Sequence, residues 1–293
     1  GISEFMGWNK PVLTDSGGFQ VMSLSKLRKI SEEGVKFQSH IDGASHFLTP
    51  ENVIDYQNII KSDIQMVLDE CIQYPESYEN VKKSMELSLR WAERSRKHYN
   101  KNKSKIYGAQ FGIIQGGVFE DLRETSISET VNFDFEGYAI GGLAVGEGHE
   151  KMIEVVDYTA PQLPEDKVRY LMGVGKPNDI IEAVYRGVDI FDCVIPTREG
   201  RHGIAYIGSS SINLKNSKFE SDLTPLDEGS DYFVSKKYSK SYLNHLLKIK
   251  DPLGPMLISL HNLNYYFNLM ANLGASIEEG RLDIFREDFY KDN

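Results

Sequence analysis

The sequence contains only two cysteines among its 293 residues, Cys71 and Cys193. Two cysteines cannot build the dense disulfide framework of a small secreted protein, and these two do not have the CxxC spacing of a zinc site. We therefore expect a protein of a reducing compartment. Hydrophobic residues make up 40% of the chain, which is enough for a sizeable core.

No apolar run approaches the roughly 20 residues that a membrane-spanning helix needs, and the chain shows no charged-then-apolar leader. P-loop and GxGxxG spacings are also absent. We expect a cytoplasmic protein that has no membrane partner.

The chain has an excess of acidic residues that is unevenly distributed. The formal net charge is −10, which argues weakly against a nucleic-acid partner. Residues 190–250 nevertheless hold nine Lys/Arg and seven Asp/Glu, and residues 236–250 hold five lysines and no acid. An acidic body with one basic sector suits guidance of RNA to one face, although a solvated lysine-rich helix has the same composition.

Short apolar runs alternate with longer amphipathic segments. Strands are predicted at residues 11–14, 64–68, 111–114, 138–140, 168–171 and 188–191, with helices between them and the longest helix at 77–99. This alternation predicts a parallel sheet with helices outside it. Polar or glycine-rich turns after five consecutive strands favour a (β/α)8 TIM-type barrel, whose active site lies at the carboxyl ends of its strands. A doubly wound open sheet is the alternative.

A hairpin is predicted at residues 35–38 and 46–48, and the helix after it should begin at Thr49 and Pro50. The apolar face expected for this helix consists of Val53, Ile54, Tyr56, Ile59 and Ile60.

The segment 187–201 carries the strongest chemical signal. An apolar run ends in Asp192, and the chain then turns at Pro196 into a basic, glycine-containing loop with Arg198 and Arg201. An acid beside arginines suggests chemistry next to an anionic substrate. A strand-end acid that makes a turn beside solvated arginines is the simpler interpretation.

Asp15, Asp69 and Asp192 each follow a predicted strand. Carboxylates that lie close together at the carboxyl ends of the strands raise one another's pKa, so such a set has few purely structural uses. Asp192 and Asp15 form a pair suited to glycosidic-bond chemistry, in which one carboxylate attacks the anomeric carbon and the other moves protons. Metal binding is the competing interpretation, but no His/Cys set accompanies the acids.

Four of the predicted strands are followed by glycine-rich turns. These turns lie at residues 17–18, 116–117, 141–142 and 173–175. Backbone groups in such turns can read a flat heterocycle, with an aromatic or methionine side chain as a stacking wall. Phe19 and Met172 stand where such walls would lie, although both residue types are more often part of a core.

Six short motifs stand out along the chain: TDSGGFQ at 14–20, DEC at 69–71, GIIQGG at 112–117, GGLAVGE at 141–147, YLMGVG at 170–175 and FDCVIPTR at 191–198. Taken together, they resemble one family, tRNA-guanine transglycosylase. The motifs stand in the family's order, and the resemblance runs from about residue 6 to residue 270. It implies a (β/α)8 barrel that exchanges guanine at the wobble position of a tRNA anticodon for a deazaguanine, on the route to queuosine.

The resemblance also implies roles for individual residues. Asp192 resembles the nucleophile that forms a covalent tRNA intermediate, and Asp15 resembles the general acid/base. In the implied base pocket, the base edge is bound by Asp69, Gln115 and Gly142 and by the backbone of Leu143 and Ala144, which Glu147 supports. The implied stacking walls are Phe19 (often Tyr in bacterial members) and Met172. Cys71 and Val145 resemble the bacterial pocket that accepts the aminomethyl precursor. Thr197, Arg198 and Arg201 resemble contacts to the tRNA anticodon loop.

The chain departs from the family at the zinc site, which normally has three Cys and one His. Ser230, Tyr232 and Ser235 stand at the cysteine positions, and only His261 is left. One histidine cannot hold a structural zinc, so we predict no zinc and no other cofactor. We expect aromatic packing to stabilise this region instead, by Tyr232, Phe233, Tyr238 and Tyr242.

The start of the chain is the second departure. The first residues, GISEF, lack an initiator methionine before Met6, and the family has a first barrel strand and helix before this point. We expect a (β/α)8 barrel at residues 1–212 without its first strand and helix, an inserted former zinc-binding subdomain at 213–262, and a C-terminal helical segment at 263–293. The resemblance also implies a homodimer.

Two other functions stay open at this stage. A non-catalytic tRNA-binding paralogue would fit the lost cysteines, but the intact acids argue against it. A carbohydrate-hydrolysing barrel would share the carboxylate pair but would not need the basic sector.

Overall fold

The computed structural model describes residues 1–23, 28–39 and 41–291. The chain divides into two compact units. The first unit comprises Gly1–Met172 and Arg186–Phe191, and the second comprises Gly173–Tyr185 and Asp192–Asn293. Each unit is described by itself.

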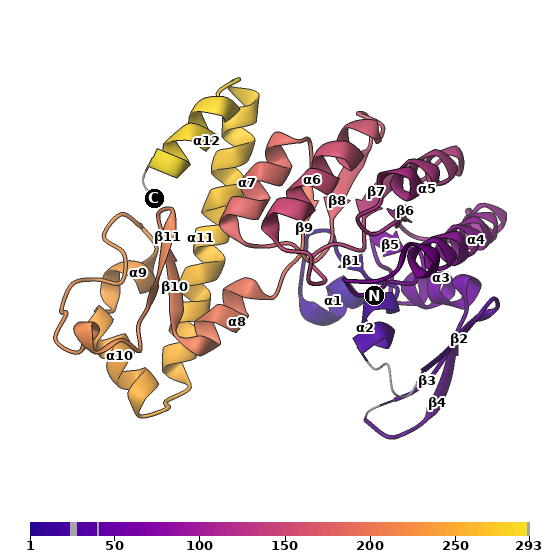
Figure 1. Ribbon diagram of the computed structural model, residues 1–293. Helices are drawn as coiled ribbons and strands as arrows, with labels where there is room; N and C mark the ends of the chain where they lie inside the picture. The colour runs from indigo at the N-terminus through magenta and orange to yellow at the C-terminus, as the bar shows by residue number, and fades with distance from the viewer. Residues whose placement is uncertain (24–27, 40, 292–293) are drawn as a thin grey trace. The chain divides into compact units, whose positions relative to one another are not determined.

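The first unit is built on a curled parallel sheet (Figure 1). Within the described residues this sheet has six strands, in the order β1-β5-β6-β7-β8-β9. Their bounds are β1 Leu13–Thr14, β5 Ile64–Met66, β6 Ala109–Ile114, β7 Gly137–Ile140, β8 Val168–Leu171 and β9 Ile190–Phe191. Every neighbouring pair is parallel. The predicted α/β class, with strands in sequential order, is therefore confirmed.

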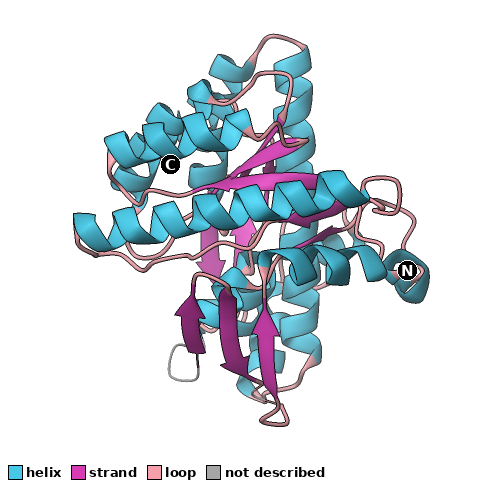
Figure 2. Ribbon diagram, turned by 90° about the vertical axis from the view of Figure 1, so that its right-hand side faces the viewer, coloured by secondary structure: helices cyan, strands magenta, loops and turns pink. Residues whose placement is uncertain are grey.

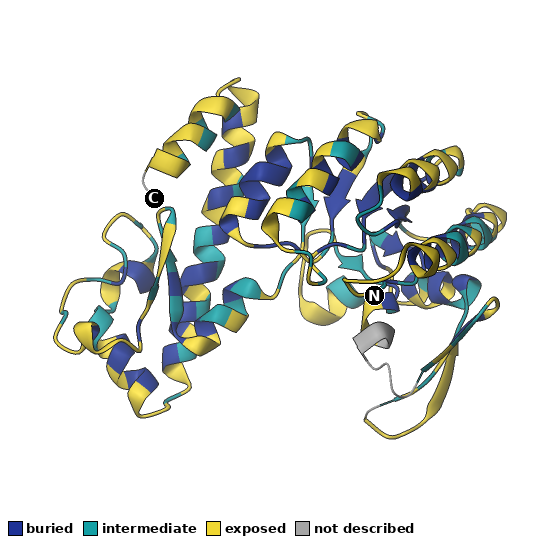
Figure 3. Cartoon of the chain, viewed as in Figure 1, coloured by how far each residue is buried: buried dark blue, intermediate teal, exposed yellow. Residues whose placement is uncertain are grey.

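Helices connect and cover these strands. Those of the first unit are α1 Ile2–Met6, α2 Gly18–Ser23, α3 Pro50–Ile59, α4 Tyr78–Asn102, α5 Glu120–Asn132, α6 His149–Thr159 and the short 3-10 helix η2 Ala160–Gln162. The helices α4 and α5 turn exposed residues to solvent, whereas the strands between them are buried (Figure 3). Each connection returns the chain to the same end of the sheet, so the carboxyl ends of all six strands lie along one edge.

A second, antiparallel sheet forms a separate layer below the parallel strands (Figure 2). It consists of β2 Arg28–Ser31, β3 Gly34–Gln38 and β4 Ser45–Leu48. The predicted hairpin corresponds to β3 and β4, and β2 was not predicted. Val35 of this sheet packs with Trp91 of α4, whose indole N–H also donates a hydrogen bond to the Glu32 carbonyl at 2.8 Å.

The start of α3 is as predicted, but its buried face is different. Thr49 caps the helix, since its hydroxyl accepts a hydrogen bond from the Asn52 N–H and its own N–H donates to Asn52 Oδ1. The prediction that Tyr56, Ile59 and Ile60 face the core is wrong, because they are 53%, 73% and 37% exposed. Gln57 is buried in their place: its amide pairs with both the N–H and the carbonyl of Met66, so the burial of this polar group is compensated.

The second unit packs helices around a small hairpin. Its elements are α7 Pro177–Tyr185, α8 Ile195–His202, β10 Ile204–Ile207, β11 Ser210–Asn213, the 3-10 helix η3 Ser217–Phe219, α9 Phe233–Lys237, α10 Lys240–Lys248, α11 Leu253–Glu278 and α12 Leu282–Lys291. The antiparallel hairpin β10–β11 and the helices α10 and α11 share an apolar core that includes Ala205, Leu243 and Ile258. Among the described residues, no helix is both long and apolar enough to cross a membrane.

The loop expected after Pro196 is instead the helix α8. Pro196 occupies the first turn of this helix, where its missing N–H costs nothing and its fixed φ favours helical geometry. Gly200 lies within α8 because the helix passes very close to α11: a Cβ at Gly200 would lie 2.5 Å from Ser259 Oγ. A glycine that looked like a loop residue therefore marks a close helix–helix contact.

Candidate active site

Four of the predicted site segments lie at the carboxyl edge of the parallel sheet, in the first unit. Asp15 directly follows β1, Asp69 follows β5, Gln115 directly follows β6, and Gly142 lies just after β7. Since neighbouring parallel strands end at the same edge, four segments far apart in sequence come together.

Asp69 and Gln115 form the centre of this group. The Gln115 Nε2 donates a hydrogen bond to Asp69 Oδ2 at 2.6 Å, and both side chains are buried. The backbone N–H of Gln115 donates to Ser126 Oγ at 3.0 Å, which ties the residue to α5. Gly18 of the first motif also lies against Asp69, because a Cβ at Gly18 would be 2.6 Å from Asp69 Oδ1.

Gly142 completes the group through a close backbone approach. Its φ is +67°, and a Cβ there would lie 2.5 Å from Gln115 Oε1. Only glycine combines this left-handed conformation with such a contact. The backbone of Gly142 also hydrogen-bonds the buried thiol of Cys71, so the two residues are linked.

Burial controls the charge of two groups in this cluster. It raises the pKa of Asp69 to about 7, with a further increase from the nearby charge of Asp15, while the hydrogen bond from Gln115 works in the opposite direction. Burial and the Asp69 charge likewise raise the pKa of Cys71 to about 12. At neutral pH Asp69 is thus close to its titration point and Cys71 is a neutral thiol.

Glu147 organises the turn that follows Gly142. Its two carboxylate oxygens accept the backbone N–H groups of Ala144, at 2.5 Å, and Val145, at 2.9 Å. Leu143 is buried, whereas Ala144 is exposed and has a φ of +56°. Val145 and Glu147 line a small pocket with Gly142 and Gly117, so this turn borders open space.

The two predicted stacking walls have different surroundings. Phe19 lies on α2 and is 51% exposed. Met172 directly follows β8 and is half-buried, and its N–H donates a hydrogen bond to the carbonyl of Ile140 at the end of β7.

Asp192 belongs to the second unit. It is exposed, and its Oδ1 accepts the N–H of Gly173 at 2.7 Å. The helix α8 begins three residues later and carries Thr197, Arg198 and Arg201. Both arginines are exposed, and their spacing of three residues puts them on one face of the helix, which gives that face a positive charge.

His261, the one histidine expected at a zinc site, forms hydrogen bonds within the protein. His261 is buried, its Nδ1 lies 2.8 Å from Ser235 Oγ, and its Nε2 lies 2.7 Å from the Tyr206 carbonyl. Since a carbonyl can only accept, Nε2 carries the proton and Nδ1 accepts from the serine hydroxyl. Burial lowers the pKa of His261, so this arrangement holds a neutral ring.

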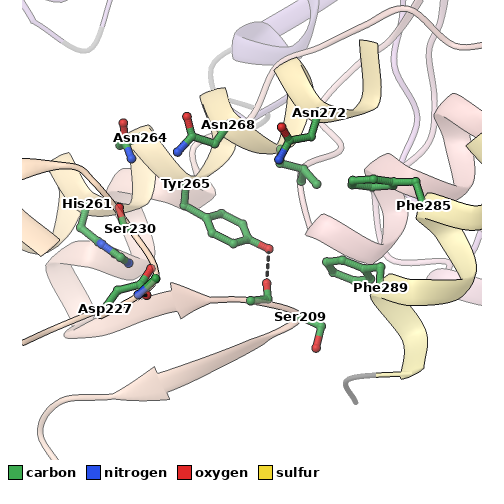
Figure 4. A pocket seen from close by; sticks show the side chains of 13 residues that line it. Ser209, Asp227, Ser230, His261, Asn264, Tyr265, Asn268, Asn272, Phe285 and Phe289 are labelled. Atoms are coloured by element: carbon green, nitrogen blue, oxygen red, sulfur yellow. Dashed lines mark hydrogen bonds between the residues drawn. The ribbon is translucent and has the colours of Figure 1, made fainter. Parts of the chain in front are cut away.

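These residues do not fit a zinc ion. A structural zinc takes four Cys or His ligands, whereas both nitrogens of His261 are occupied and serine and tyrosine hydroxyls are poor zinc ligands. Asp227, Ser230 and His261 line one end of a cavity of about 270 Å³ (Figure 4). In the part of the chain that the structure describes, no three His, Cys, Asp or Glu side chains are grouped as metal ligands.

The aromatic packing expected near this site is confirmed for all four residues. Tyr232 and Tyr238 pack against the apolar core of the second unit. Phe233 and Tyr242 are 57% and 40% exposed. Each of them nevertheless packs against a neighbouring ring: Phe233 against Tyr232, with ring centroids 5.0 Å apart, and Tyr242 against Tyr238, with centroids 5.8 Å apart.

Analysis of the sequence missed one residue of the cluster, Arg123. Its guanidinium is buried and donates hydrogen bonds to carbonyls on both sides of Gln115. The available signal was weak: an arginine in the first turns of a helix, a position where acids are usual.

Comparison with known proteins identifies relatives that match nearly the entire chain. The protein-family model described as "Queuine tRNA-ribosyltransferase" matches residues 1–293. A "Queuine tRNA-ribosyltransferase" of Rickettsia typhi is 55% identical over 281 residues, which cover 96% of this chain and 77% of that protein. Proteins of the same description from Caulobacter vibrioides and Photobacterium profundum are 53% and 51% identical, over 99% of this chain and 77% and 76% of their own lengths. The chain belongs to the queuine tRNA-ribosyltransferase family.

Proposed function

We propose that this chain exchanges the guanine at the wobble position of a tRNA anticodon for the aminomethyl-deazaguanine precursor of queuine, as a pentosyltransferase of queuosine biosynthesis. The observation that supports this most directly is the buried Asp69–Gln115 pair at 2.6 Å, beside the backbone of Gly142. This group presents a carboxylate, an amide and a peptide edge in one place.

A guanine-type base suits this group. Guanine carries N–H donors on one edge and the O6 acceptor beside them. We infer that Asp69 accepts N–H groups of the base, while Gln115 and the backbone of Gly142 pair with the acceptor edge. A site that uses buried polar groups in this way discriminates strongly against bases that leave them unpaired.

The exchange proceeds in two displacements. The carboxylate of Asp192 attacks C1′ of the ribose, the C1′–N9 bond breaks, and the departing guanine takes a proton from a general acid. The incoming base then loses a proton to the same group and attacks C1′, which releases Asp192. We assign the proton transfers to Asp15, which follows β1 and contributes to the electrostatics of the base group.

The other site residues are assigned by position. Phe19 and Met172 stack on the base, Leu143 and Ala144 offer backbone groups in the turn held by Glu147, and Cys71 and Val145 leave room for the aminomethyl group. Thr197, Arg198 and Arg201 contact the anticodon loop. The exposure of both arginines supports this last assignment, since phosphate contacts require accessible cations.

We further propose that the six sequential parallel strands belong to a (β/α)8 barrel at residues 1–212, followed by a former zinc-binding subdomain at 213–262 and a helical segment at 263–293. The curled sheet and its strand order support the barrel. A homodimer is the proposed assembly, and light scattering at two protein concentrations would test it.

The test of the function is incorporation of labelled guanine into unmodified tRNA. We expect exchange by the natural chain and a loss of at least roughly 10³-fold in Asp192→Asn, as for removal of a nucleophile. Asp189→Asn is the matched control: Asp189 directly precedes β9, its carboxylate accepts the backbone N–H of Arg169 in β8, and exchange should stay within about threefold. Tight tRNA binding without any exchange by the natural chain would contradict the proposal.

A further inference from the structure

Arg123 is a buried cation whose hydrogen bonds, within the part of the chain that the structure describes, all go to backbone carbonyls. It lies on α5 and is 1% exposed. Its Nε donates to the Gly117 carbonyl at 2.9 Å, its Nη1 to the Ile114 carbonyl at 3.1 Å, and its Nη2 to the Gly141 carbonyl at 2.9 Å. One rigid side chain therefore connects three backbone sites.

These three carbonyls surround the residues that would read the base. Ile114 and Gly117 lie on either side of Gln115, and Gly141 directly precedes Gly142. The Arg123 Nη2 would also lie 3.6 Å from a Cβ at Gly142. The ends of β6 and β7 are consequently fixed to each other at the point where the Gln115 amide meets the Gly142 backbone.

Burial of the Arg123 guanidinium costs free energy of hydration. No ion pair of Arg123 is found among the described residues; burial lowers its pKa to about 10, and the charge of Glu147 offsets this only in part. Burying an unpaired guanidinium loses hydration that carbonyl hydrogen bonds only partly restore. A lysine could not replace it, because an ammonium on a flexible stem cannot reach three carbonyls in the fixed directions of a planar fork.

We propose that Arg123 is the positioning residue of the base pocket, which sets the affinity for the base by holding Gln115 and Gly142 in register. This inference rests on the proposed function and deepens it. It also has an electrostatic consequence: the hydrogen bond from Gln115 lowers the pKa of Asp69, so loosening Gln115 weakens that bond and moves the titration of base binding to higher pH.

The test compares Arg123→Met and Arg123→Lys with Arg169→Met. Arg169 is a matched control: it is 9% exposed, its guanidinium donates to the carbonyls of Leu163 and Gly187, and it lies at the amino end of β8, away from the base group. For each folded variant the KM for guanine, kcat, the tRNA affinity and the pH profile of guanine binding are measured, with thermal melting beside them.

We expect Arg123→Met to raise the KM for guanine at least roughly tenfold, with a smaller change in kcat and an unchanged tRNA affinity, the pattern of lost ground-state binding. Its pH profile should shift upward, in the direction that Gln115→Met also produces. Arg123→Lys should give a weaker effect of the same kind. Arg169→Met should lower the melting temperature and leave the KM and the pH profile in place.

A different result would overturn the proposal. If Arg123→Met and Arg169→Met both lose activity only in proportion to stability, or if Arg123→Lys keeps the natural KM and pH profile, Arg123 is a structural residue. Should Arg123→Met fail to fold, the lysine variant alone decides. Calorimetric titration with guanine separates the proposed role of Arg123 from the proposed exchange activity. It measures the effect of Arg123 on base affinity even if the natural chain does not exchange bases.

Discussion

At the scale of single residues, Asp69 links structure to a measurable pH dependence. Its pKa is raised to about 7, first by burial and then by the charge of Asp15. Because the base offers N–H donors, it binds the ionised carboxylate and not the carboxylic acid. We predict that guanine affinity increases as the pH rises from 6 to 8, with a midpoint near 7, in calorimetric titrations.

Two variants sharpen this prediction. Asp15→Asn removes the like charge and should move the midpoint to lower pH, while Asp69→Asn should abolish the pH dependence together with most of the affinity. A guanine affinity that stays constant between pH 6 and 8 would contradict the assignment.

The raised pKa of Asp69 also affects folding. Because its pKa in the folded state exceeds the ordinary value of 3.8, the stability that Asp69 contributes below pH 4 is lost as the pH rises through 7.

The sequence motifs propose which residues form the site, but they do not show how the side chains of these residues pair. Asp69, Gln115 and Gly142 stand in motifs that mark them as site residues. The hydrogen bond between Asp69 and Gln115 depends on the register between β5 and β6, which short motifs do not encode. Arg123 escaped notice for a related reason: its role lies in three backbone carbonyls that become neighbours only after folding.

At the scale of elements, the contact between α8 and α11 is the clearest difference from expectation. A proline followed by a glycine suggested a loop, whereas the structure has a helix whose Gly200 lies against Ser259. We predict that Gly200→Ala destabilises the protein by about 1–3 kcal/mol through overpacking, measured by urea unfolding. Because α8 carries Arg198 and Arg201, the variant should also weaken tRNA binding.

A matched glycine on α11 gives the control. A Cβ at Gly274 would have nothing within 4 Å, so Gly274→Ala should raise the stability by up to about 1 kcal/mol through helix propensity. If both variants lower the stability equally, the effect of Gly200 comes from helix chemistry in general and not from the contact with Ser259.

The hydrogen bond between Ser235 and His261 predicts that the stability of the folded chain depends on pH. The pKa of His261 is lowered from its ordinary 6.5 by burial, so the neutral ring favours the folded state. The unfolding free energy should therefore fall as the pH drops below about 6.5, and His261→Gln should lack this part of the acid sensitivity.

Metal analysis provides the complementary measurement. We expect no stoichiometric zinc in the purified protein and no change in its melting temperature on addition of a chelator. One zinc per chain, or strong destabilisation by the chelator, would mean that the residues around His261 bind a metal in spite of their chemistry.

At the scale of the whole molecule, charge distribution should govern tRNA binding. The chain carries a net charge of −10, so attraction to RNA depends on local groups such as Arg198 and Arg201. The double variant Arg198→Ala/Arg201→Ala should weaken tRNA binding and reduce the slope of log K against log salt by about 1.4, since each lost phosphate contact removes roughly 0.7. Filter binding at several salt concentrations measures this slope.

Lys82→Ala/Lys83→Ala on α4 removes the same total charge from exposed positions of the first unit. It should leave the slope within error of the natural value. Equal effects of the two double variants would show that only the net charge matters, and not the exposed face of α8.

The class of the fold was more predictable than its details. Apolar runs of four to six residues separated by helical segments identify a parallel sheet with high specificity, and the order of the strands follows the order of the chain. The strand β2 and the buried Gln57 were not predictable, because both depend on partners distant in sequence: β2 on its pairing with β3 and Gln57 on the backbone of Met66.

The central claim is that base exchange passes through a covalent bond between Asp192 and the ribose of the tRNA. The most direct test incubates the protein with unmodified tRNA in the absence of free base and separates the products on a denaturing gel. We predict a protein–tRNA band that resists denaturation, maps by mass spectrometry to the peptide with Asp192, disappears when free guanine is added, and is absent in Asp192→Asn but present in Asp189→Asn. A band of equal intensity in Asp192→Asn, or labelled exchange by the natural chain without any band, would contradict this account.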